Sequence, residues 1–136
     1  MTELYPYSAK EALERGELEL WRESHYANQD CKTAIEAAIR ESFDGCRLQQ
    51  DCVSPVVDRF GWDRVELVLA NTLREKQWDG RFSWANKEWA NNVEVPEDGS
   101  HNIALIISSH PAVLDGFVQL FREAQTQENQ QGFRMQ

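Results

Sequence analysis

From Glu17 to Phe43 the chain contains neither proline nor glycine, and this long run constrains the fold more than any other feature. Most of its residues are strong helix formers, and Asp44-Gly45 supplies a stop at its end. Its apolar residues follow helical spacing and form one side: Leu18, Trp21, Ala27, Cys31, Ala34, Ile35, Ala38 and Ile39. The run predicts one long helix, or two if it breaks near Asn28, packed against other helices.

Local signals predict five further helices, over residues 9–15, 54–60, 62–77, 84–91 and 112–125. Ser8 and Glu11 have capping-box spacing, Pro55 suits a first helical turn, and Ser83 suits an N-cap. The clearest amphipathic stripe is Val65, Val68, Leu69, Thr72 and Leu73. The fold class is therefore mainly α, a single compact domain of about six helices over residues 1–125.

Two segments fall outside this helical pattern. The β-like runs at residues 93–96 and 103–107 flank a turn-rich stretch and can pair as a short two-stranded β-hairpin. Such a ribbon is marginal unless it packs on helices. Residues 126–136 are rich in glutamine and are expected to be a flexible tail.

The stretch WDGRFSWANKEWA, residues 78–90, holds unusually much aromatic surface. Helical spacing predicts that Trp78, Phe82 and Trp89 face the core, whereas Trp84 falls on the opposite side and is exposed. An exposed tryptophan is typical of an interface hot spot. Arg81 and Lys87 are expected to act as capping or surface charges, with contact to a partner as the alternative.

The net charge is −9, from 23 acidic and 14 basic residues, and it is unevenly distributed. Residues 88–128 carry seven acids and only one base, Arg122. This balance disfavours direct binding to nucleic acid, which depends on lysine and arginine at phosphates. It suits an acidic surface that binds a basic, nucleic-acid-handling protein.

Catalytic and metal-binding motifs are absent from the sequence, which predicts no catalytic residue, metal or cofactor. One alternative is a small enzyme that acts around His25, Asn28 and Lys32, which fall at i, i+3 and i+7, or around His110. The three cysteines lack zinc-site spacing and are expected to be reduced, mostly buried thiols. With no apolar run of membrane-spanning length and no signal-peptide pattern, we expect a cytoplasmic protein.

Three blocks together resemble a bacterial domain-of-unknown-function family, over about residues 4–123: LYPYSAKEALERGELELWRESHYANQDCKTAIEAAI, FGWDRVELVLANTLREKQWDGRFSWANKEWA and SSHPAVLDGF. That family occurs on plasmids, conjugative elements and prophages of Gram-positive bacteria, alone or within large polyvalent proteins. The resemblance implies a mobile-element protein, and small acidic proteins of such elements are often counter-defence factors, including anti-CRISPR proteins.

The leading hypothesis is a non-enzymatic inhibitor that binds a host defence protein with a basic nucleic-acid-binding surface, most plausibly a CRISPR effector nuclease. The expected contact residues are Trp84, Glu94, Glu97, Asp98 and Asp115. Besides the enzyme, a further alternative is an accessory module for conjugation or replication.

Overall fold

Six α helices make up most of the part of the chain that the computed structural model describes, residues 4–48, 50–94 and 111–134. Their order is α1 (Ala9–Arg15), α2 (Leu18–Ser42), α3 (Ser54–Phe60), α4 (Trp62–Glu75), α5 (Trp84–Asn91) and α6 (Pro111–Arg134), with a 3-10 turn, η1 (Gln50–Cys52), before α3. The predicted fold class, mainly α with about six helices in one domain, is confirmed.

The helix ends show the local chemistry behind these boundaries. The Ser8 hydroxyl accepts a hydrogen bond from the Glu11 backbone N–H at 3.1 Å, so the predicted cap of α1 is present. Gly16 ends α1 with φ of +72°, a left-handed conformation that costs glycine no Cβ clash. Ser83 caps α5 in the same way as Ser8, accepting from the Asn86 N–H at 3.2 Å.

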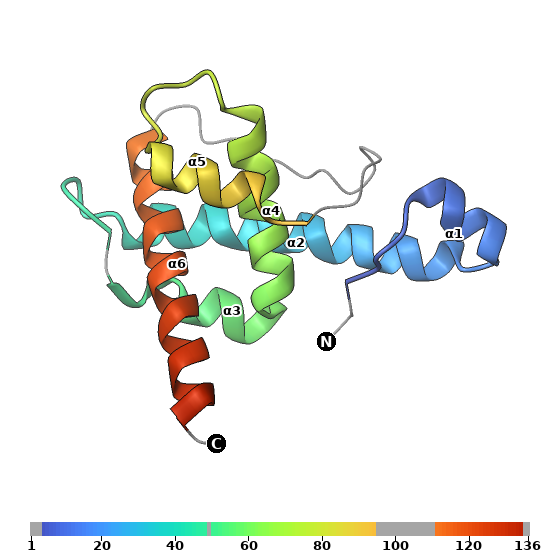
Figure 1. Ribbon diagram of the computed structural model, residues 1–136. Coiled ribbons are helices and arrows are strands. Elements are labelled where there is room, and N and C mark those ends of the chain that lie inside the picture. Colours follow the sequence, from blue (N-terminus) through green and yellow to red (C-terminus); the bar gives the residue numbers. More distant parts are fainter. Residues whose placement is uncertain (1–3, 49, 95–110, 135–136) are drawn as a thin grey trace.

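Helix α2 runs without interruption from Leu18 to Ser42, so it does not break near Asn28. Its inward side buries Cys31, Ile35 and Ile39. In Figure 1, α2 crosses behind α4 and extends away from the other helices toward α1, which packs against its N-terminal part. The chain therefore consists of a helical bundle with an α1–α2 arm.

Helix α4 is the centre of the bundle, with α2, α3 and α5 packed against it. The whole predicted stripe on α4 is buried: Val65, Val68, Leu69, Thr72 and Leu73. Leu67 and Ala70 are buried as well, so α4 has little surface in contact with water. Phe117, Val118 and Phe121 of α6 complete the same hydrophobic core.

Two boundaries differ from the sequence prediction. Helix α4 ends at Glu75 rather than Gln77, and α6 continues past Gln125 to Arg134. The predicted β-hairpin near residues 93–107 lies almost entirely outside the described residues; the described ones contain no strand, only an isolated antiparallel bridge between Phe43 and Leu48. Flexibility of residues 126–136 stays a prediction.

None of the helices in the described ranges combines the length and apolar character needed to cross a membrane.

Candidate protein-interaction site

The connection between α4 and α5, residues 76–84, carries two exposed tryptophans, and we call it the tryptophan elbow. Trp78 is 75% exposed and Trp84 is 76% exposed. The prediction that Trp84 is exposed is confirmed. The prediction that Trp78 faces the core is wrong: residue 78 lies in the turn that follows α4, where helical spacing does not determine the direction of the side chain.

Phe82 is the aromatic side chain of the elbow that does enter the core. It is 4% exposed, as predicted. Trp89, on α5, is half-buried and packs edge-on against Phe121, with ring centroids 6.0 Å apart. The aromatic stretch therefore has one buried ring (Phe82), one half-buried ring (Trp89) and two exposed rings (Trp78 and Trp84).

Asp79 organises the turn between the exposed tryptophans. Its buried carboxylate accepts hydrogen bonds from the Arg81 backbone N–H at 3.0 Å, from Arg81 Nε at 2.9 Å and from Arg81 Nη2 at 2.8 Å. These hydrogen bonds from Arg81 lower the pKa of Asp79 from its ordinary 3.8 to about 2. Arg81 is thus a partner of Asp79 within the elbow.

Lys87, on α5, also stabilises the tryptophan elbow. Its side chain is buried, and its Nζ donates a hydrogen bond to the carbonyl oxygen of Gln77 at 3.1 Å. Asn91 Nδ2 also donates to Gln77 Oε1 at 3.3 Å. Of the two roles open to Lys87 in the sequence, the structure shows capping of the chain that leaves α4.

Asp115 ties the start of α5 to α6. Its Oδ1 accepts from the Ser83 backbone N–H at 3.0 Å and from Asn86 Nδ2 at 2.9 Å. Asn86 is fully buried, and its Oδ1 accepts from Arg122 Nη1 at 2.8 Å. Asp115, predicted as a partner contact, is half-buried and already serves this internal network; contact with a partner stays a prediction.

Arg74 holds the other end of α5, a role that the sequence did not indicate. Its guanidinium donates to the carbonyl oxygens of Ala90 at 3.1 Å, Asn91 at 3.2 Å and Val93 at 2.6 Å. Helix termini leave carbonyl groups without helical partners, and an arginine satisfies several at once. Helix α5 is therefore fixed at both ends.

The remaining predicted contact residues lie apart from Trp84. Glu94 is exposed and lies three residues beyond the end of α5, whereas Trp84 begins this helix. Between them the outward side of α5 exposes Ala85, Glu88, Asn91 and Asn92. Glu97 and Asp98 lie outside the described residues. Trp84 and Glu94 thus lie at opposite ends of α5.

The residues of the predicted enzyme site have different surroundings. Asn28 is fully buried, and its Oδ1 accepts from Arg64 Nε at 2.7 Å; Arg64 Nη2 also donates to Ser24 Oγ at 3.0 Å. The His25 ring stacks on Trp21, with centroids 5.0 Å apart, and Lys32 pairs with Glu36 at 3.6 Å. His110 lies outside the described residues. Because their surroundings differ, His25, Asn28 and Lys32 do not share one open site.

No group of three or more His, Cys, Asp or Glu side chains in the described ranges could hold a metal ion. The three cysteines are free thiols, with Cys31 and Cys52 buried and Cys46 exposed.

The fold and the elbow define a small, acidic, helical domain that exposes aromatic side chains on a connection held by hydrogen bonds. A family model described as "Protein of unknown function (DUF3849)" matches residues 4–126. The chain belongs to this family. No curated protein and no solved structure matches it significantly.

Proposed function

We propose that this chain is a non-enzymatic protein-binding domain and that the tryptophan elbow anchors its partner. The observation that carries the proposal is the exposure of Trp78 and Trp84, each about three-quarters in water, on a connection fastened by Asp79, Lys87 and Asp115. Tryptophan is enriched in binding hot spots. Because these hydrogen bonds already order the connection, it loses little conformational entropy on binding.

The charge of the domain supports a basic partner. The net charge is −9, and the exposed acids nearest the elbow in the chain are Glu75 at the end of α4 and Glu88 on the outward side of α5. The positive charge of Arg81 is largely compensated by Asp79. An acidic surface accelerates encounter with a basic surface and selects against acidic competitors.

The finer form of the proposal concerns the identity of the partner. A protein whose basic surface normally holds nucleic acid fits both the charge and the exposed aromatics, and a CRISPR effector nuclease is our specific candidate. The mobile-element context that the sequence resemblance implies is the reason for this choice. Occlusion of the basic surface would then block DNA engagement, and inhibition would saturate at a fixed ratio of inhibitor to nuclease.

An affinity pull-down from host lysate and from purified effector nucleases tests the proposal, at low and at high salt. Recovery of a basic partner that is lost at high salt is expected, because salt screens exposed charges. The Trp78→Ala/Trp84→Ala variant should weaken binding at least about tenfold. Tyr26→Ala, which removes another exposed aromatic from α2, is the matched control and should bind normally.

The stability of these variants separates binding from folding. Exposed substitutions away from special contacts change the free energy of unfolding by at most about 0.5 kcal/mol, so the double tryptophan variant should stay folded. Phe82→Ala, in contrast, should cost about 3–5 kcal/mol because it empties a core position. If the double variant captures the partner as well as the unaltered chain does, the elbow is not the anchor.

A further inference from the structure

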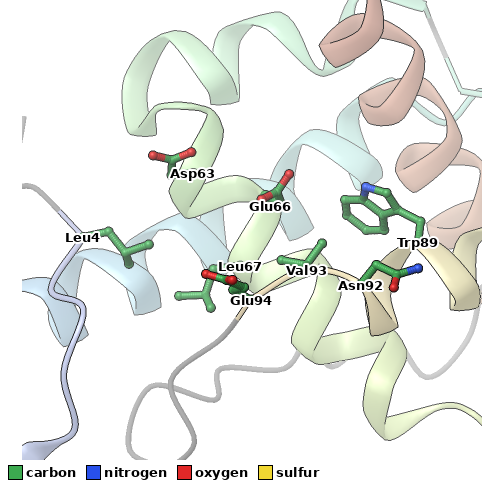
Figure 2. A pocket seen from close by; sticks show the side chains of 8 residues that line it. All are labelled: Leu4, Asp63, Glu66, Leu67, Trp89, Asn92, Val93 and Glu94. Atoms are coloured by element: carbon green, nitrogen blue, oxygen red, sulfur yellow. The ribbon is translucent and has the colours of Figure 1, made fainter.

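A pocket of about 520 Å³ lies between the N-terminal segment, α4 and the residues that follow α5 (Figure 2). Its lining consists of Leu4, Asp63, Glu66, Leu67, Trp89, Asn92, Val93 and Glu94. Three of these residues are acidic and none is basic. The charged side chains that line this pocket are therefore all negative.

The carboxylates of the pocket have no cationic partner in the described part of the chain. No ion pair there includes Asp63, Glu66 or Glu94. Glu66 accepts one neutral hydrogen bond, from Gln125 Nε2 at 2.6 Å. In Figure 2 the Asp63, Glu66 and Glu94 side chains lie between Leu4 on one side and the Trp89 indole on the other. Carboxylates in this arrangement favour a cation.

The other residues that line the pocket favour one kind of cation. Leu4, Leu67 and Val93 supply apolar surface, and Trp89 supplies an aromatic ring. An arginine side chain combines an apolar stem with a planar guanidinium that binds carboxylates and stacks on indole. A bare metal ion fits less well, because no group of acidic side chains in the described residues is close enough to hold one.

We propose that this pocket receives an arginine side chain of the protein partner. The inference rests on the proposed protein-binding function and names a second contact of the same partner. Asn92 and Glu94, which line the pocket, follow α5, the helix that begins at Trp84, so the pocket lies at the other end of this helix from the tryptophan elbow. The tryptophan elbow anchors one end of the contact, and the arginine pocket selects a basic residue at the other.

A peptide titration of the full chain tests the pocket without the partner. The probe is acetyl-Gly-Arg-Gly-amide, and the matched control replaces arginine with citrulline, which has the same shape without the charge. We expect saturable binding of the arginine peptide, with a dissociation constant on the order of 1 mM, and none of the citrulline peptide. In two-dimensional NMR the Trp89 indole N–H signal, assigned with Trp89→Phe, should shift.

Charge-neutralising variants locate the binding. Glu66→Gln and Glu94→Gln should each weaken the arginine peptide about two- to fivefold, because each removes one partly exposed attraction. Glu41→Gln, an equal charge change at an exposed α2 position outside the pocket, should have no effect. Trp78→Ala/Trp84→Ala should also leave peptide binding unchanged, since neither residue lines the pocket.

The outcomes separate this inference from the broader proposal. Absence of saturable binding up to about 20 mM peptide, equal binding of the citrulline peptide, or insensitivity to both glutamine variants would each overturn the arginine pocket. Failure of the lysate and nuclease pull-downs, with peptide binding intact, would overturn the proposed partner while the pocket assignment stands.

Discussion

Lys87 reaches back from α5 to the end of α4, and its buried Nζ donates a hydrogen bond to the carbonyl oxygen of Gln77 at 3.1 Å. This contact joins two helices that meet at an irregular turn. The buried ammonium group satisfies a backbone carbonyl oxygen in the turn that follows α4. The exposed Trp78 directly follows the residue that Lys87 holds.

Lys87→Met should lower the free energy of unfolding by about 1 kcal/mol. A hydrogen bond from a charged donor contributes about 1.5–3 kcal/mol, and the apolar contacts of methionine recover part of it. Urea denaturation measures the change, and amide hydrogen exchange at Gln77 and Trp78 should become faster. Lys10→Met, at an exposed position of α1, is the control. Unchanged exchange in the elbow would show that Lys87 does not fasten it.

Asp115→Ala should cost about 1–3 kcal/mol, because the Ser83 N–H loses its side-chain acceptor and the buried Asn86 amide keeps only the Asp115 backbone carbonyl at 3.1 Å. Thermal unfolding followed by circular dichroism measures this loss. Asp30→Ala removes an exposed acid from α2 and should be nearly neutral. Equal melting temperatures for the two variants would contradict the internal role of Asp115.

The Asp79 carboxylate should make the elbow sensitive to acid. Its folded pKa, about 2, lies below the ordinary value of 3.8. The stability that ionised Asp79 contributes is therefore fully present above about pH 4 and is lost as the pH falls toward 2. Urea unfolding at several pH values in this window should show a steeper loss for the unaltered chain than for Asp79→Asn. Asp58→Asn, at an exposed α3 position, should retain the steep loss.

The three thiols should differ in reactivity under native conditions. Burial raises the pKa of Cys31 to about 12 and also raises the pKa of Cys52, whereas Cys46 is exposed. Because thiolate is the reactive form, a disulfide reagent at pH 8 should label Cys46 quickly and the other two only after denaturation. Cys46→Ser should remove the fast phase; a second fast thiol would contradict the burial of Cys31 and Cys52.

The helical elements were predictable because their signals are local. Ser8, Gly16, Pro55 and Ser83 act on neighbouring backbone groups, so spacing along the chain suffices to locate α1, α3 and α5. The same reasoning placed Trp84 correctly, since it lies within the first turn of α5. It failed for Trp78, which lies in the turn between α4 and α5, where helical spacing does not determine the direction of a side chain.

The contacts that build the site were not predictable in this way, because they join residues distant in sequence. Asn86 meets Asp115 and Arg122 on α6, and Arg74 meets the end of α5. Nothing in a single sequence indicates which helices pack together. Polar residues at inward positions, such as Asn86 and Lys87 on α5, were the available signal that partners for them exist in the core.

The hydrogen bonds that hold the elbow in place affect how the sequence of such a domain can evolve. Hydrogen bonds of Asp79, Asn86 and Lys87 hold the backbone of the elbow in place, whereas the indoles of Trp78 and Trp84 contribute little to the core. Recognition and folding therefore depend on separate side chains. Positions 78 and 84 can be exchanged for other residues at small energetic cost, and one scaffold can acquire new binding preferences without having to fold anew.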